Sequence, residues 1–276
     1  REAAKEFLSE NKSEVITTSS YYLLKWIACI TMLIDHIALF FRHQCSIPDD
    51  TYLAMRYIGR IAFPLFAYLM VESFHHTKSR GKHLFHIGIL ALVSEIPFDV
   101  INISRKSLEG DILTFEYQNV CISLFLSYLL LLITDKPYEK VRNFYGDKAL
   151  GKIVEANIKI LFLGLFVAAG TLLNVDFGMG GILLVFLLNV SRKTKHKQFF
   201  QALSFAAFGL TQAHIAYLFI IVPFALICLV QSSKHFHQKE ALPQRFMRSK
   251  FSKLFTRTFY PVHMIALIAV RIIMVA

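Results

Sequence analysis

The stretch from Lys25 to Phe41, KWIACITMLIDHIALFF, is long and apolar enough to be a membrane-spanning helix. Asp35 and His36 lie next to each other inside it. On insertion scales an ionisable side chain at the centre of a spanning helix costs about 3 kcal/mol, so such residues usually face a cavity and mark function. The stretch therefore predicts a transmembrane helix that carries part of a functional site.

The remainder of the chain extends this prediction to a bundle of helices. Hydrophobic residues make up 55% of the 276 positions and include 26 phenylalanines, which excludes an ordinary soluble domain. The apolar runs have helical lengths and lack the strict alternation of a β-barrel. We therefore predict an all-α fold, a polytopic transmembrane helix bundle of 8–9 spans with its N-terminus inside. Residues 1–20 would form a polar N-terminal segment and residues 21–276 a single transmembrane domain.

Nine apolar runs are candidate spans. They lie at 21–41, 52–74, 83–98, 117–134, 158–174, 177–190, 199–213, 214–230 and 256–275. Several are shorter than the roughly 20 residues of a full crossing, and 199–230 could be one long tilted helix instead of two short ones.

The positive charges help to decide the span count. With nine spans and the N-terminus inside, nearly all Lys and Arg residues fall on the inner side, and only Arg42, Arg105 and Lys106 fall on the outer side. This asymmetry favours two spans in 199–230 and a multi-pass protein of a bacterial inner (cytoplasmic) membrane. It also accounts for the net charge of +11 without a nucleic-acid partner. The basic inner loops could bind anionic lipid or a phosphorylated cofactor, or only determine topology.

Polar residues inside the predicted spans gather mostly at one depth, in the outer half of the membrane. This group comprises Asp35, His36, Arg60, Glu95, Asp99, Gln118, Asn119 and Asp176. A smaller group lies nearer the inside and comprises Glu72, His76, Tyr260 and His263. The cysteines lack paired metal-ligand spacing, so we expect no metal site.

Each polar residue also has an interpretation as a structural residue. Asp35 and Arg60 could form only a buried ion pair that fixes two helices. Asp176 could cap the following helix, and Gln118 and Asn119 could be helix-end residues.

The prolines and the histidine raise separate expectations. Pro97 predicts an interruption near the outer end of its helix, and Pro261 predicts a break just before His263. Adjacent helical residues point about 100° apart, so Asp35 is poorly placed to orient His36. We expect that partner to come from another span, with Glu95 or Asp99 as candidates.

Three classes of membrane protein could use a polar track from one face to the other. A secondary transporter usually has internal repeats, which this sequence lacks, and a structural subunit would not need so many ionisable groups. A group-transfer enzyme needs a general base and donors that stabilise a developing oxyanion. His36 or His263 could be that base, and Arg60 or Tyr260 could donate. The enzyme is the preferred interpretation, with the transporter as the alternative.

The chain resembles the TraX family, named for the conjugative pilin N-acetylase and placed with the wider transmembrane acyltransferases. The resemblance is carried, in order, by KWIACITMLIDHI, YIGRIAFPLFAYLMVESFHHT, SEIPFD, QNV, DFGMGG and FYPVHM. Positions that coincide with family motif residues are Asp35, His36, Arg60, Pro64, Glu72, Asp176, Gly178, Tyr260 and His263. Position 177 is Phe where the family motif is expected to have Tyr.

The resemblance implies acetyl-CoA, or another acyl-CoA, as donor co-substrate. We expect transfer to an amine or hydroxyl of a protein N-terminus, a glycan or a lipid-linked sugar, either directly or through a covalent intermediate. His36 is the expected general base, Asp35 and Arg60 a supporting pair, and His263 with Tyr260 the lining of the thioester path. The expected binding residues are Tyr260, Glu72, His76, Glu95, Asp99, Asn119, Asp176 and Gly178.

Overall fold

The computed structural model describes residues 18–42, 44–106, 117–135, 139–145, 148–212, 217–232 and 249–275. The polar segment 1–20 lies largely outside this part of the chain, as do residues 245–248 of the basic stretch 245–253. The helices are α2 (Thr18–Phe41), α3 (Asp49–Gly59), α4 (Ala62–His76), α5 (Arg80–Lys106), α6 (Val120–Thr134), α7 (Glu139–Phe144), α8 (Lys148–Leu172), α9 (Gly178–Ser191), α10 (Lys197–Thr211), α11 (Tyr217–Ser232) and α13 (Lys250–Val275). The all-α prediction is confirmed.

Several of these helices are suited to a membrane, so the chain is a multi-pass membrane protein. Among the described residues, five segments are long and apolar enough to cross it, namely Tyr21–Phe41, Asp49–His76, Arg80–Ile101, Ala149–Leu172 and Leu254–Met274. The same part of the chain also contains three shorter apolar helices, Val120–Thr134, Gly178–Ser191 and Ile220–Gln231. The stretch 199–230 forms two helices, α10 and α11, as the charge pattern predicted. Large apolar side chains on the outer faces, such as Leu92 and Leu161, are exposed as they would be to lipid.

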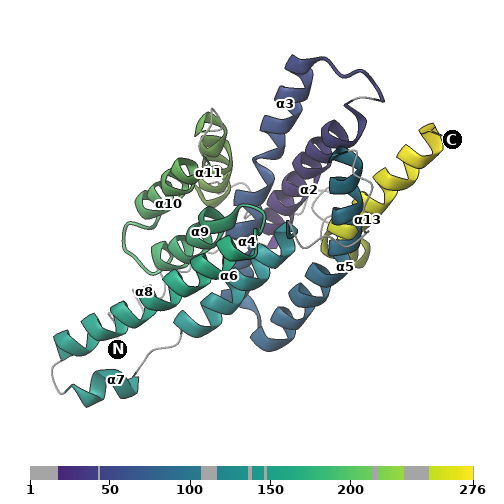
Figure 1. Ribbon diagram of the computed structural model, residues 1–276. Helices are drawn as coiled ribbons and strands as arrows, with labels where there is room; N and C mark the ends of the chain where they lie inside the picture. The colour runs from purple at the N-terminus through teal and green to yellow at the C-terminus, as the bar shows by residue number, and fades with distance from the viewer. Residues whose placement is uncertain are drawn as a thin grey trace.

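Contacts at two levels fix the relative direction of α2 and α13. Trp26 Nε1 donates to Ser252 Oγ over 2.9 Å, and further along the same helices His36 meets His263, so α2 and α13 run parallel. This agrees with the predicted topology, in which the first and last spans both run outward. At the end of the bundle near α7, the connections after α4, α6 and α9 meet, whereas α13 ends at the opposite side (Figure 1).

The apolar segment 49–76 is divided into two helices at Arg60 and Ile61. Pro64 explains the break, because it has no N–H to donate to the carbonyl of Arg60, four residues earlier. The Arg60 amide instead bonds to Tyr57 and Arg56, and the Ile61 amide to Ile58. The break places the end of α3 against α2, above the start of α4.

Pro97 and Pro261, which were expected to interrupt their helices, do not. α5 continues through Pro97 and α13 through Pro261. Both expectations of a broken helix are therefore wrong. A spanning helix tolerates a proline where neighbouring helices compensate for the freed carbonyl, and both helices pack closely against others and against each other.

Candidate active site

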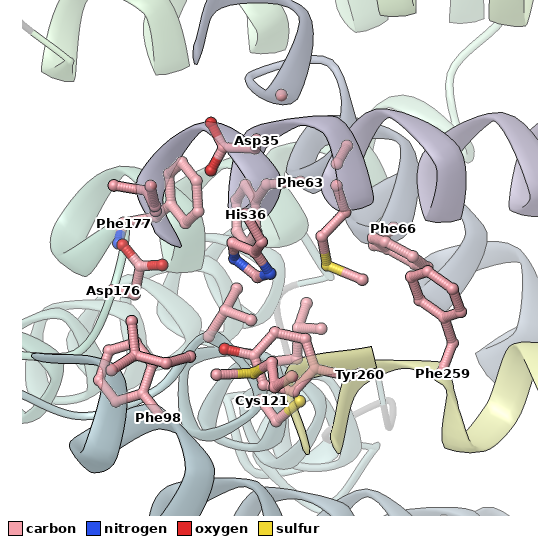
Figure 2. Close-up of a pocket in the computed structure, with 18 of the residues that line it drawn as sticks. Asp35, His36, Phe63, Phe66, Phe98, Cys121, Asp176, Phe177, Phe259 and Tyr260 are labelled. Atoms are coloured by element: carbon pink, nitrogen blue, oxygen red, sulfur yellow. The ribbon is translucent and has the colours of Figure 1, made fainter. Parts of the chain in front are cut away.

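A cavity of about 530 Å³ lies between α2, α3, α4, α5, α6 and α13. Its volume is within the roughly 300–1,000 Å³ of small-molecule sites. Most of its lining is apolar, and it is closed on one side by the turn before α9. The polar side chains that line it include Asp35, His36, Arg56, Arg60, Asp176 and Tyr260. Figure 2 shows His36, on α2, directed into the cavity opposite Tyr260 on α13.

His36 is held by a chain of hydrogen bonds that starts at a backbone carbonyl. His263 Nδ1 lies 2.6 Å from the carbonyl oxygen of Phe259, which can only accept, so Nδ1 donates. In the neutral ring His263 Nε2 is then an acceptor, and it lies 2.6 Å from His36 Nδ1. His36 Nδ1 therefore donates, and the lone pair of neutral His36 is on Nε2. The described residues make no hydrogen bond to this Nε2.

Packing keeps this chain rigid. The ring of His263 stacks on Phe259, with centroids 4.5 Å apart and planes 11° apart, and its side chain is buried. Tyr260 meets both imidazoles edge to face, at 6.2 Å from His36 and 5.8 Å from His263. The expected partner of His36, Glu95 or Asp99, is thus replaced by His263. Only the packing of α13 on α2 makes this contact possible.

Asp35 forms its ion pair with Arg56, and not with the predicted Arg60. Arg56 Nη1 donates to Asp35 Oδ2 over 2.6 Å, and both side chains are largely buried. The contact requires a glycine at position 59, because a Cβ there would lie 2.2 Å from Asp35 Cβ. Arg60 also lines the cavity, but its guanidinium lies 5.9 Å from the ring centroid of Phe177.

A strained turn brings Asp176 and Phe177 to the cavity wall. Asn174 and Phe177 adopt positive φ values of 51° and 61°, which non-glycine residues rarely adopt. The turn is fixed by pairing with Gln118, which accepts from the Asp176 amide over 3.0 Å. Asp176 Oδ1 accepts from the Phe177 amide over 3.0 Å. Asp176 thus binds the amide just before α9 and also faces the cavity (Figure 2).

Phe177 belongs to an aromatic cluster. Its ring stacks on Phe63 with centroids 4.1 Å apart and planes 11° apart, and Phe208 completes the group. A Cβ at position 181 would lie 2.8 Å from Phe63 Cζ, so the glycine there admits this ring. Position 177 therefore gives the cavity an apolar wall where a Tyr would add a hydroxyl.

The predicted outer group is only partly assembled at the cavity. Asn119 is the N-cap of α6, where its Oδ1 accepts from the Cys121 amide over 2.8 Å. Its Nδ2 donates to Glu95 Oε2 and, over 2.9 Å, to the carbonyl of Ala91. Asp99 is buried on the same helix as Glu95. Asn119 and Glu95 join α5 to α6, and Asn119, Glu95 and Asp99 do not line the cavity.

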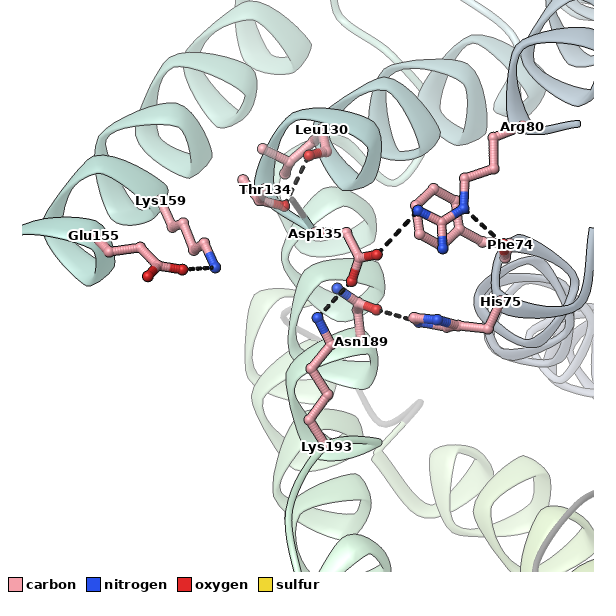
Figure 3. Close-up of polar contacts among 10 residues, drawn as sticks. All are labelled: Phe74, His75, Arg80, Leu130, Thr134, Asp135, Glu155, Lys159, Asn189 and Lys193. Carbon is pink, nitrogen blue, oxygen red and sulfur yellow. Dashed lines mark hydrogen bonds and ion pairs between the residues drawn. The ribbon is translucent and has the colours of Figure 1, made fainter. Parts of the chain in front are cut away.

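Glu72 and His76 lie apart from the cavity, near the end of α4. Glu72 Oε1 accepts from Arg192 Nε over 3.3 Å, and His76 Nε2 is 3.6 Å from Glu72 Oε2. A neighbouring cluster joins the same end of the bundle (Figure 3). There Asp135 binds both Arg80, at 3.1 Å, and Lys193.

Comparison with known proteins places the whole bundle in one family. The TraX protein family matches residues 20–271. The chain belongs to the TraX family. It is also similar to the probable fimbrial assembly protein FimC, serogroup H1, of Dichelobacter nodosus, with 33% identity over 116 residues. That match covers 41% of this chain and 46% of the relative, so the chain spans under half of the relative's length. No solved structure matches.

The sequence of this TraX-family protein did not single out Arg56 as a site residue. Its spacing from Arg60 is one helical turn, which could have marked it as a second cation on the same face. Gly178, a motif position, has a φ of 41° and begins α9 beside the cavity wall. His263 was expected on the thioester path, and the structure places it directly against His36.

Proposed function

We propose that this TraX-family protein is a membrane acyltransferase. It would move an acyl group, with acetyl the first choice, from cytoplasmic acyl-CoA to an amine or hydroxyl at or across the membrane. The observation that carries the proposal is the hydrogen-bonded sequence from the Phe259 carbonyl through His263 to His36. It leaves a basic imidazole nitrogen, His36 Nε2, inside a mostly apolar cavity. General bases positioned in this way contribute about 10²–10⁴-fold to rates.

The proposed step balances as a direct transfer. His36 Nε2 takes the proton from the acceptor N–H or O–H as the acceptor attacks the thioester carbonyl. The imidazolium that forms is stabilised by the hydrogen bond from its Nδ1 to His263. When the tetrahedral intermediate collapses, the C–S bond breaks and the CoA thiolate leaves. It takes up the proton that His36 received, which restores the neutral base.

The cationic wall supports the intermediate. Arg60 makes no ion pair within the described part of the chain, and it lines the same cavity as His36. A guanidinium aimed at a developing oxyanion in a site shielded from water is the usual electrostatic contribution to acyl transfer. Arg56 is already neutralised by Asp35, so its role would be to position the wall.

A protein acceptor is the first choice among the acceptors. The relative from Dichelobacter nodosus is named as a fimbrial assembly protein, and fimbriae are protein filaments. An N-terminal amine or a side-chain hydroxyl of an exported subunit would then enter from the outer side. Glycans and lipid-linked sugars offer the same nucleophilic atoms and remain part of the proposal.

The test measures thiol release and label transfer together. Purified protein in detergent is mixed with acetyl-labelled CoA and candidate acceptors, and free CoA thiol and acceptor label are followed. Thiol release that requires acceptor and is lost in His36→Ala supports the proposal. Full activity in His36→Ala removes the histidine from its role. Uptake of solute by proteoliposomes without thiol release would favour a secondary transporter instead.

A further inference from the structure

Three basic side chains lie near one another where α2, α5 and α13 meet, and one of them, Arg257, lines the cavity. Arg257 lines the cavity, one helical turn before Tyr260 on α13. Lys25 on α2 and His83 on α5 both lie within electrostatic reach of Arg257, and of each other. The three residues therefore come from three helices, α2, α5 and α13, which pack against one another.

This group differs from the other basic residues in having no carboxylate partner. Neither Lys25 nor Arg257 forms an ion pair within the described residues. The titratable groups that act electrostatically on Lys25 and His83 are Cys29, Arg257, His86 and one another, and none of these is a carboxylate. His83 Nδ1 is buried without a hydrogen-bond partner in the same part of the chain. Like charges gathered beside low-dielectric walls attract an anion.

The separation from His36 indicates what kind of anion fits. At a rise of 1.5 Å per residue, Lys25 lies about 16 Å from His36 along α2. Arg257 lies about 9 Å from His263 along α13 by the same rise. A ligand that binds both places needs an anionic end, a long narrow arm and a reactive carbonyl at its tip. A nucleotide-linked thioester has this shape. Its arm also carries no charge, which suits the apolar lining of the cavity.

We propose that Lys25, His83 and Arg257 bind the phosphate groups of the acyl-CoA donor, while the pantetheine arm extends through the apolar cavity to His36. This assignment rests on the proposed function, and it names the donor subsite of that enzyme. Arg257 supplies the planar donor group suited to phosphate oxygens, and Lys25 a compact positive charge behind it. The basic side chains at Asp135, in contrast, are already paired.

The experiment measures binding, which needs no turnover. Affinities of CoA, of the nucleotide half of CoA and of pantetheine are determined for protein in phosphatidylcholine nanodiscs. Arg257→Ala and Lys25→Gln are each expected to weaken CoA and nucleotide binding about tenfold, or about 1.4 kcal/mol. Pantetheine binding should not change. The matched control is Lys195→Gln, which removes an exposed charge at the same end of the bundle and should leave all three affinities unchanged.

Two outcomes would overturn the assignment. One is nucleotide affinity that is the same in wild type, Arg257→Ala and Lys25→Gln. Thermal unfolding, measured also for the conservative variant Arg257→Lys, shows that these proteins are folded. The other is binding of anionic lipid alone: Arg257→Ala and Lys25→Gln weaken binding to phosphatidylglycerol, and the nucleotide does not bind to the wild type. If acyl transfer occurs, the donor KM should rise in Arg257→Ala and kcat should fall in His36→Ala. Nucleotide binding without any acyl transfer would support the nucleotide subsite and contradict the proposed acyltransferase activity.

Discussion

The cavity around His36 and the cluster around Asp135 are both polar sites in an apolar bundle, yet they differ in how fully their groups are bonded. Asp135 is bound by Arg80 and Lys193, and His75 Nε2 donates to Asn189 Oδ1 over 2.7 Å (Figure 3). His36 uses one ring nitrogen and keeps the other free in the cavity. Buried polar groups that form hydrogen bonds with each other join helices, whereas a lone pair without a hydrogen-bond partner beside a cavity can act on a ligand.

The largest expected difference between the two regions is catalytic. His36→Ala should reduce acyl transfer by about 10²–10⁴-fold, because it removes the base from the cavity. Asp135→Asn, at the other region, should leave the rate per folded molecule within about twofold. Thiol release from acetyl-CoA by equal amounts of folded protein measures both. A similar loss of activity in the two variants would abolish the distinction between them.

His263 should matter through His36. His263→Ala removes the acceptor for His36 Nδ1, so the active tautomer is no longer fixed, and the loss should be roughly tenfold to a hundredfold. His263→Gln can still accept that hydrogen bond through its amide oxygen and should recover part of the rate. The rate as a function of pH should be measured for each. An Ala variant with the wild-type rate and pH profile would show that His263 only packs.

Gly59→Ala tests the packing under Asp35. The new Cβ would lie 2.3 Å from Asp35 Oδ1, so α2 and α3 must separate, at a cost of about 1–3 kcal/mol. Gly164→Ala on α8 is the control, because its Cβ meets nothing within 4 Å. That change should be neutral or stabilising by about 0.5–1 kcal/mol. Thermal unfolding of the two purified variants compares them, and equal melting temperatures would contradict the crowding.

The smallest effect concerns pH and the Asp135 cluster. Burial acts to raise the pKa of Asp135. The positive charge of Lys193, together with His75 and Arg80, outweighs burial, so the pKa is lowered overall. A carboxylate whose folded pKa is depressed stabilises the fold above its unfolded pKa of about 3.9, and this stability is lost as pH falls through the folded value. Both cationic partners are more than a third exposed, so the expected loss in Asp135→Asn is only about 0.5–1 kcal/mol at neutral pH. The difference in the free energy of unfolding between wild type and Asp135→Asn should become smaller as the pH approaches 3. A difference that stays constant with pH would show that the ion pairs contribute nothing.

Much of the fold could be predicted from the sequence because the membrane restricts the choices. Backbone groups in hydrocarbon must be satisfied within each segment, so apolar runs of this length become helices. The charges then gave the direction of the helices and the split of 199–230. The prolines were less informative, since Pro64 interrupts its segment and Pro97 and Pro261 do not. Whether a helix continues depends on the neighbours that compensate for the missing N–H.

The sequence by itself determined that Asp35 and His36 lie in a long apolar helix and that other ionisable residues lie inside apolar runs. It could not determine which side chains are hydrogen-bond or ion-pair partners. Partners such as His36 and His263 are more than 200 positions apart and meet only when α13 packs on α2. The tertiary structure chose Arg56 for Asp35 and His263 for His36. It also left the second nitrogen of His36 free, and that depends on which surfaces the helices bury against each other.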